Sequence, residues 1–394
     1  MFKLPFEMGI FSSNKPHIAT IIDIGSSSIG ASAVLLYPDK KPSVLYTIRK
    51  DMAFQEKFNF DRFVLSMLET LENVVQELSS FPLPSHSDQT TLCVFSSPWY
   101  ASQTRSVKKT FETTTKITEK ILEEIQNTEV EAFKQSELKS MGEDAVILEA
   151  ETIQTKINGY ETAHPFGKQA NDMQTVMYIS ISPKSIIKPV TDKLRKHIHG
   201  NNLHFSSFSF CSFVAVRDIF HGKNFMLIDI SGEVSDISIV KDHVLQETFS
   251  FPFGKNFLLR KIASETGHTF QEAISQFRMV SNLESNENNS KKILIAMEKA
   301  GKDWLLECKN ALTPILENQE VLPHDVFITA DEDVSMWFIS NVQEFENSSF
   351  TFTDKQFSIK HLNPTFLSSF CESETGVERD PFIMIESLFV KRFI

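Results

Sequence analysis

Two short Asp-Gly turns, far apart in the chain, carry the residue types best suited to chemistry. The first, DIGSSS, begins at Asp23, and the second, DISG, begins at Asp229. Each follows an apolar β-branched run and leads into another, which predicts strand, tight turn and strand. Glycine lets the backbone pass close to a ligand, successive amides in such a turn bind an anion, and aspartate holds a hard cation. The pattern therefore predicts a nucleotide phosphate with magnesium, held between two similar lobes.

An ordinary structural role is open for the same residues. The Asp side chain often caps a β-turn by accepting a hydrogen bond from nearby backbone. Gly25 and Gly232 suit either role, because both roles need the same turn shape. Asp236, just after the second turn, could orient a water molecule or face solvent from a strand.

The composition describes an acidic chain with room for two lobes. Its 394 residues carry a net charge of −12, with 41% hydrophobic and 23% charged residues, as is ordinary for a globular protein. The acidic balance, with no long block of Lys or Arg, argues against binding of nucleic acid. Four scattered cysteines form no C-x-x-C pair, so we expect neither zinc nor a disulfide framework, and we expect a reducing cytoplasm. No stretch approaches the ~20 apolar residues of a membrane-spanning helix.

Hydrophobic periodicity divides the chain into two similar halves with a block inserted in the first. The stretch DRFVLSMLETLENVVQELS at 61–79 predicts an amphipathic helix. Residues 91–186 alternate strands with a helix that Thr118 would cap, and predict a compact α+β unit. A long helix is expected from Lys291 to Leu316. The motifs HPFGKQ and FPFGK mark further glycine turns.

Taken together, these segments resemble the actin-like ATPase superfamily, and within it the branch of FtsA and PilM. DIGSSSIG looks like the family's first phosphate loop and DISGEVSDISIV like its second. SFPFGKNFLLRKIASETG looks like the strand, Gly turn and helix that pass near the nucleotide in these proteins. INGYETAHPFGKQ falls in an insertion placed where FtsA carries its characteristic subdomain. The resemblance runs from about His17 to the C-terminus.

The resemblance implies an α/β fold of two actin-like (ribonuclease H-like) lobes with an α+β subdomain inserted in the first. Lobe I would span 1–90 and 187–224, with the inserted subdomain at 91–186. Lobe II would span 225–254 and 317–394, with a helical subdomain at 255–316. ATP and magnesium would bind between the lobes, with Asp23 and Asp229 as metal ligands and no catalytic residue indicated. The implied cofactor-binding residues are Asp23, Gly25, Ser26, Ser27, Ser28, Asp229, Ser231, Gly232, Asp236 and Gly254.

Four departures from the family pattern affect the predicted site. Ser231 stands where a Gly is usual, Val234 where a Thr hydroxyl would bind phosphate or magnesium, and Gly30 where relatives often have Lys. The residues from Ala330 to Asp333 replace a Gly-Gly pair that lies beneath adenine. Side chains there would crowd a purine, and their three carboxylates would repel a polyphosphate. We therefore expect a degenerate ATPase that acts as a scaffold.

The resemblance leaves three functions open. One is an FtsA-like cytoplasmic adaptor of bacterial cell division or envelope assembly, which self-associates and binds an FtsZ-like protein. Another is a PilM-like platform that binds the tail of a pilus-assembly membrane protein. The third is an active ATPase or small-molecule kinase. Residues 380–394 would either reach the inner face of the membrane as a tail or close the fold as a helix that Asp380 caps and Pro381 begins.

Overall fold

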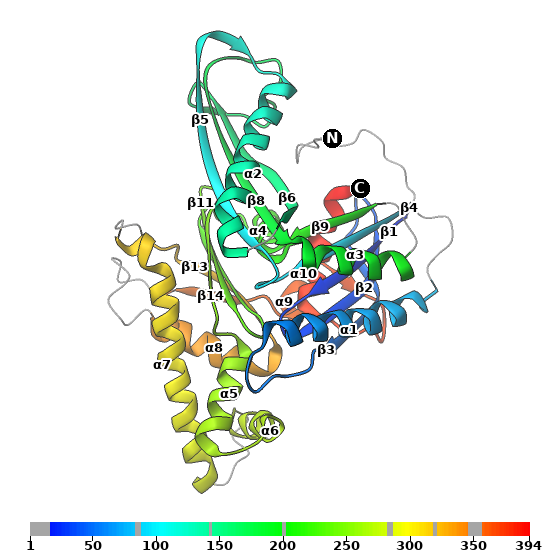
Figure 1. The fold of residues 1–394 in the computed structure, drawn as a ribbon, viewed down its shortest axis with the longest axis vertical. Coiled ribbons are helices and arrows are strands. Elements are labelled where there is room, and N and C mark those ends of the chain that lie inside the picture. The colour runs from blue at the N-terminus through cyan, green and yellow to red at the C-terminus, as the bar shows by residue number, and fades with distance from the viewer. Residues whose placement is uncertain are drawn as a thin grey trace.

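The chain, seen here as a computed structural model, folds around three β-sheets of six, five and four strands (Figure 1). The structure describes residues 16–82, 88–141, 144–198, 202–281, 287–317, 321–345 and 357–394. The first two sheets each contain one Asp-Gly hairpin, and the third extends away from them at one end of the molecule. Within the described ranges, no helix is long and apolar enough to cross a membrane.

The first sheet has the order β15-β3-β2-β1-β4-β9, with the first Asp-Gly hairpin near its centre. Helices cover both of its faces, so the side chains of β1 alternate between two cores. Ile22 and Ile24 share a core with α1 and α3, whereas Ala19 and Ile21 share one with α4 and α10. By this alternation, Asp23 points toward α4 and α10. The elements of this lobe are β1 (His17–Ile24), β2 (Ser28–Leu36), β3 (Ser43–Asp51), α1 (Phe60–Ser79), β4 (Asp88–Phe95), α3 (Lys184–His197), β9 (Leu203–Ser207), α4 (Phe208–Ile219), β15 (Glu372–Ser373) and α10 (Pro381–Val390).

The second sheet repeats this arrangement with the order β12-β11-β10-β13-β14. Met226 and Ile228 of its central strand share a core with the helices that follow the hairpin, while Phe225 and Leu227 face α4 and α10. Asp229 therefore points into the same region as Asp23. The elements are β10 (Phe225–Ile230), β11 (Ser235–Lys241), β12 (Val244–Phe251), α5 (Lys255–Thr266), α6 (Phe270–Ser281), α7 (Glu287–Glu317), β13 (Asp325–Ala330), α8 (Glu332–Phe345), β14 (Ser358–His361) and α9 (Pro364–Leu367).

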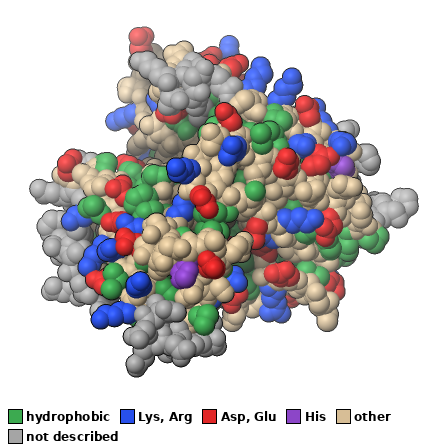
Figure 2. Space-filling view, turned by 60° about the horizontal axis from the view of Figure 1, so that its bottom comes forward, with side chains coloured by type: hydrophobic (Ala, Val, Ile, Leu, Met, Phe, Trp, Pro, Cys, Tyr) green, Lys and Arg blue, Asp and Glu red, His purple; other side chains and the backbone are tan. Residues whose placement is uncertain are grey.

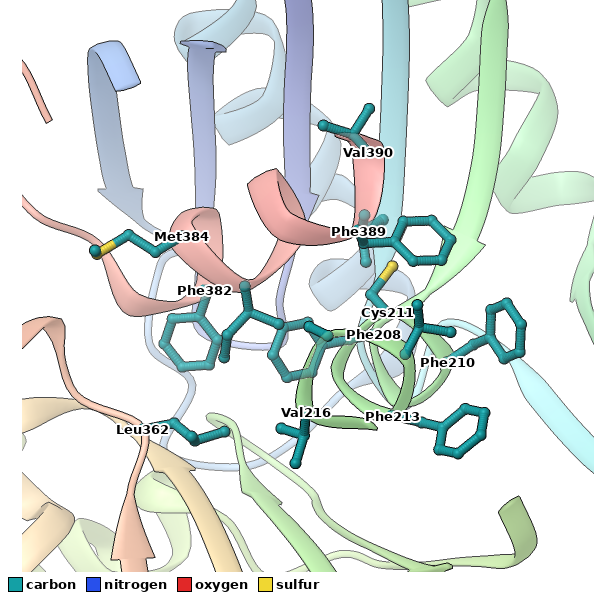
Figure 3. Packing of buried hydrophobic residues seen from close by; sticks show 14 of the residues in the cluster. Phe208, Phe210, Cys211, Phe213, Val216, Leu362, Phe382, Met384, Phe389 and Val390 are labelled. Carbon is teal, nitrogen blue, oxygen red and sulfur yellow. The ribbon is translucent and has the colours of Figure 1, made fainter. Parts of the chain in front are cut away.

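The helices α4 and α10 pack together and share one core with both sheets (Figure 3). Phe208 and Phe210 of α4 meet Phe382 and Phe389 of α10 in this core, with ring centroids 5.5 and 5.9 Å apart. Eight of the ten residues of α10 are buried, as is required of a helix that is apolar on all sides. The predicted cap is confirmed: Asp380 is the N-cap, its side chain accepts from two amides of the first turn, and Pro381 begins the helix. Residues 380–390 therefore close the fold.

The course of the chain differs from the predicted boundaries at two places. β15 pairs with β3, and α10 contacts β1, so the chain returns to the first sheet after residue 371, although 317–394 was assigned to the second lobe. The continuous apolar face of α10 finds its largest buried surface between the sheets. β4 pairs with β1 in the first sheet, so the third sheet begins at Ala101 and not at residue 91.

The third sheet, with the order β5-β8-β6-β7, packs on one long helix. Glu149 of this sheet joins it to the first lobe. The carboxylate of Glu149 accepts hydrogen bonds from Ser180 Oγ (2.9 Å), from Ser207 N (3.0 Å) and from the hydroxyls of Ser206 and Ser207. Burial nevertheless raises its pKa to about 7. The elements are β5 (Ala101–Lys116), α2 (Glu119–Met141), β6 (Ala145–Ile157), β7 (Tyr160–Glu161) and β8 (Gln169–Pro183).

Replacing Glu149 should change how stability depends on pH. A carboxyl whose folded-state pKa is raised stabilises the fold while it is protonated, so this contribution is complete below pH ~4.5 and is lost as the pH rises to about 7. The loss is on the order of 3 kcal/mol for a shift of this size. Glu149→Gln is neutral at every pH and should flatten the fall in unfolding free energy between pH 4.5 and 7.5, measured by urea denaturation.

The slope should not vanish in Glu149→Gln, because burial also raises the pKa of Glu151 to about 7. Glu161→Gln, at an exposed position of the same subdomain, is the matched control and should keep the wild-type slope. An unchanged slope in Glu149→Gln would contradict the prediction.

Candidate functional site

The two Asp-Gly turns meet each other directly. The hydroxyls of Ser26 and Ser231 lie 2.6 Å apart, and the backbone N–H of Glu233 donates to Ser26 Oγ at 2.9 Å. A Cβ atom on Gly232 would come within 2.3 Å of the Cβ atom of Ser27. The glycine is therefore needed for the close approach of the turns. In this arrangement serine side chains occupy the space between the turns where a phosphate was predicted.

Asp23, the first predicted magnesium ligand, is engaged by a cation of the chain itself. Arg49 Nη2 lies 2.6 Å from Asp23 Oδ2, and Arg49 Nε lies 2.6 Å from Asp380 Oδ2. The same guanidinium donates from Nη1 to Ser28 Oγ at 3.0 Å. Asp23 is 2% exposed, and burial raises the pKa of its carboxyl although Arg49 opposes the shift. A guanidinium fork suits carboxylates as a divalent cation does, so Arg49 supplies the positive charge beside Asp23 that a metal ion was predicted to supply.

Gly30 provides the room that Arg49 needs. In the pairing of β2 with β3, Gly30 lies opposite Arg49. A Cβ atom on Gly30 would come within 2.6 Å of Arg49 Nη2. The glycine that stands where relatives often have Lys is thus coupled to an arginine on the neighbouring strand.

Asp229, the second predicted magnesium ligand, is held by a neutral donor. Thr329 Oγ1 donates to Asp229 Oδ1 at 2.5 Å, and Asp229 Oδ2 has no hydrogen-bond partner among the described residues. Burial raises the pKa of this carboxyl well above its usual range, and the charges of Asp236 and Asp23 raise it further. Burial therefore favours the neutral form of the Asp229 carboxyl, and a neutral carboxyl is a poor ligand for a hard cation.

Asp236 was predicted to bind a cofactor or a water molecule, whereas in the structure its side chain binds two serine hydroxyls. Its carboxylate accepts hydrogen bonds from Ser97 Oγ (2.9 Å) and from the hydroxyl of Ser250. Burial raises its pKa to about 6. This residue joins β11 to the segment after β4, and both of its side-chain donors are protein hydroxyls.

The amides at the start of α5 are also used within the chain. Lys255 N donates to Ser231 O at 2.9 Å, and Asn256 N donates to Gly232 O at 2.7 Å. A Cβ atom on Gly254 would lie 2.3 Å from Ser231 O. The helix N-terminus, a common phosphate-binding feature, is therefore packed against the second turn.

The acidic segment that replaces the family's glycine pair forms ion pairs on the second lobe. Lys255 Nζ lies 2.9 Å from Asp331 Oδ2 and 3.1 Å from Asp333 Oδ1. Arg278 Nη2 pairs with Asp333 Oδ2 at 3.1 Å. Glu332 and Asp333 also lie in the first turn of α8, where negative charge is favourable.

The residues present do not fit a magnesium nucleotide in this arrangement. Of the predicted ligands, Asp23 is paired with Arg49, and burial favours the neutral form of Asp229. Several amides of the turns and of the start of α5 are bonded within the chain, namely those of Gly25, Ser231, Glu233, Lys255 and Asn256. In the part of the chain that the structure describes, no group of three or more His, Cys, Asp or Glu side chains is placed to hold a metal ion. The site is a closed contact between the lobes.

Three residues beside the turns could not be assigned from the sequence. Arg49 lies outside the turn motifs, as does Arg260, whose Nη2 lies 2.7 Å from Glu233 Oε1. Glu386 lies in the apolar α10. Glu386 is fully buried, and neither of its carboxylate oxygens has a hydrogen-bond partner in the described ranges. Burial raises its pKa well above the usual range, as does the charge of Asp23. The one available signal was Gly30, since glycine inside a strand indicates close approach of another group.

The paired hairpins and the two helix-covered sheets define the actin-like ATPase fold. No known protein-family profile matches the chain, and no characterised protein sequence matches it. Among solved structures, it is similar to a chain of the PilM-PilN type IV pilus biogenesis complex, with 11% identity, a TM-score of 0.61 and 97% coverage of both chains.

Two further solved structures match less well. The ethanolamine utilization protein EutJ from Carboxydothermus hydrogenoformans is 11% identical, with a TM-score of 0.41 and coverage of 95% of this chain and 89% of EutJ. A Bacteroides thetaiotaomicron protein with an actin-like ATPase fold is 12% identical, with a TM-score of 0.38 and coverage of 86% of this chain and 91% of that one. At these identities the likeness shows the fold alone.

Replacing Arg49 should destabilise the chain strongly. Arg49→Met leaves the carboxylates of Asp23 and Asp380 buried without a cation, and we expect a loss of about 3–5 kcal/mol of unfolding free energy at pH 7. Because protonation removes the unpaired charge, part of this loss should be recovered as the pH falls toward 5. Urea denaturation at both pH values measures the effect.

Arg105→Met is the matched control for this variant. It removes a half-buried ion pair with Glu129 in the inserted subdomain, and it should cost roughly 1 kcal/mol with little pH dependence. Equal losses of unfolding free energy in the two variants would contradict the prediction that Arg49 contributes more to stability than Arg105 does.

Proposed function

We propose that this chain is a nucleotide-independent docking platform with an actin-like fold. The observation that carries the proposal is the position of the Arg49 guanidinium, 2.6 Å from both Asp23 and Asp380. A cation of the chain itself thus neutralises Asp23, one of the two predicted metal ligands, so we infer that this residue needs no magnesium nucleotide. The remaining capability of such a fold is to present surfaces to other proteins.

For the partner, we propose a pilus-assembly protein. The similarity to the PilM-PilN type IV pilus biogenesis complex covers 97% of both chains, which supports a PilM-like arrangement of the whole molecule. On the face shown in Figure 2, positive and negative side chains are interspersed with hydrophobic ones, as is ordinary for a protein surface. We therefore expect the partner to be the peptide tail of a membrane protein, which is the class of partner that the sequence resemblance to PilM implies.

Membrane contact, in this proposal, comes through the partner. Residues 380–390 are buried against both lobes, so they do not serve as an amphipathic membrane tail. The chain would then work at the inner face of a membrane only while its partner holds it there. An FtsA-like role in cell division and self-association stay predictions of the resemblance.

Titration with ATP tests the nucleotide part of the proposal. We expect no binding of a fluorescent ATP analogue at millimolar concentration, with or without magnesium, and no release of phosphate. The physical reason is that Asp23 and the amides of Gly25, Ser231 and Glu233 are already bonded within the chain. Saturable, magnesium-dependent binding that Asp23→Ala abolishes would contradict the proposal. Hydrolysis of ATP would instead favour an active ATPase or kinase.

Peptide titrations test the partner. Labelled cytoplasmic tails of a pilus-assembly membrane protein and of FtsZ, both from the same organism as this chain, should be compared by fluorescence anisotropy. We expect saturable binding of the pilus-protein tail that is unchanged by magnesium-ATP. Binding of the FtsZ tail alone would favour the division role, and a scrambled tail controls for sequence specificity.

A further inference from the structure

Glu233 lies at the tip of the second hairpin, and its carboxylate is held by donor groups as a bound anion would be. Arg260 donates to its carboxylate through both Nη atoms, at 2.7 Å each, and Asn256 Nδ2 donates to it at 2.8 Å. The carboxylate therefore sits at the first turn of α5, where negative charge is favourable. The Glu233 side chain is 13% exposed, which makes a bidentate pair with arginine stronger than at the surface.

Arg260 extends this contact to the first lobe. Its Nε donates to the backbone carbonyl of Gln55 at 3.0 Å, and its guanidinium lies over the ring of Phe54 at 5.1 Å from the centroid. Phe54 in turn stacks on Phe270 of α6. The segment after β3 is thus held by two helices of the second lobe.

The same segment is tied to the first Asp-Gly turn. Met52 N donates to Ser27 O at 2.7 Å, and Ser26 accepts the backbone N–H of Glu233. Together these contacts form a closed ring. Glu233 binds Arg260, and Arg260 binds the backbone of Gln55. Met52, three residues before Gln55, binds Ser27 of the first turn, which contacts the tip of the second hairpin through Ser26. Each lobe contributes one Asp-Gly turn and one neighbouring segment to this ring.

We propose that Glu233 is an internal anion that locks the two lobes together. Its carboxylate fixes Arg260 in the orientation that reaches the first-lobe backbone and the ring of Phe54. The lock deepens the proposed function and rests on its claim that no nucleotide is needed, because a charge of the chain supplies the closure. Without the carboxylate, Arg260 gains rotamer freedom and the first-lobe segment loses its partner.

The contacts around Glu233 differ from other ion pairs of the second lobe because they reach the first lobe. Glu233 and Arg260 both belong to that lobe, so their pair alone would not join the lobes. The joining contacts are those of Arg260 to Gln55 O and Phe54, and that of Glu233 N to Ser26. Lys261, the next residue of α5, pairs with Asp303 at 2.9 Å within the second lobe and offers a comparison.

Hydrogen exchange measured by mass spectrometry on the full chain tests the proposal. In Glu233→Gln, peptides that cover 24–29 and 50–58 should exchange roughly tenfold faster, the change that corresponds to about 1.4 kcal/mol of opening free energy. Lys261→Gln should exchange as the wild type does in these peptides. Core peptides of β10 and α7 should be unchanged in both variants, which separates opening of the lobes from unfolding.

Arg260→Lys provides a second variant should Glu233→Gln not fold. It keeps the charge but loses the bidentate pair and the planar stacking on Phe54, so an intermediate rate is expected in the same peptides. Wild-type rates in Glu233→Gln, or in Arg260→Lys if only that variant folds, would overturn the proposal.

An arm with magnesium-ATP separates this proposal from the proposed function. If the nucleotide slows exchange of the wild type while Glu233→Gln opens, the lock stands and the nucleotide-independent function fails. If the nucleotide has no effect and Glu233→Gln exchanges as the wild type does, the lock fails and the function stands.

Discussion

The structure depends most on the ion pairs of Arg49, which join the first Asp-Gly turn to α10, the helix packed between the two sheets. This half-buried arginine pairs with two buried carboxylates, Asp23 of β1 and Asp380 at the start of α10. An ion pair in such a position is costly to desolvate, and it survives only when the geometry of both partners is good. Here the donors are shared among two carboxylates and Ser28, so the guanidinium satisfies three elements at once. The first Asp-Gly turn is fixed to the C-terminal helix through it.

The position of α10 follows from this anchor and determines how the lobes meet. With its N-terminus held beside Asp23, the helix runs between the sheets and packs on α4 in one continuous core. The turns at the edge of that core come into contact through Ser26 and Ser231. Buried acids remain in the same region, above all Glu386 and Asp229, and burial raises the pKa of both carboxyls and so favours their neutral forms. Arg49 and these acids thus lie in the region where a charged ligand was predicted to bind.

The sequence predicts the elements of this fold well where the pattern is local. The Asp-Gly turns, the cap at Asp380 and the amphipathic helix at 61–79 each depend on neighbouring residues, and all three are present. The helix α4 has no such pattern, because FSFCSFVAV is buried on all sides and its Phe and Val residues are as typical of strands. Its place between the sheets could not be predicted from periodicity.

The partners of the site residues are the other part that sequence reasoning cannot supply. Arg49 and Asp380 are separated by most of the chain, and their contact exists only because α10 returns to the first sheet. The departures at Gly30, Ser231 and Ala330 to Asp333 indicated a changed site but not what replaced the ligand. Long-range charge pairs depend on the tertiary fold, whereas caps and turns do not.

A crystal structure grown with magnesium and a non-hydrolysable ATP analogue at millimolar concentration tests the central claim most directly. We expect Arg49 between Asp23 and Asp380, the hydroxyls of Ser26 and Ser231 in contact, and no phosphate density between the turns. Density for a triphosphate and a metal ion beside Asp23, with Arg49 displaced and the turns apart, would contradict it.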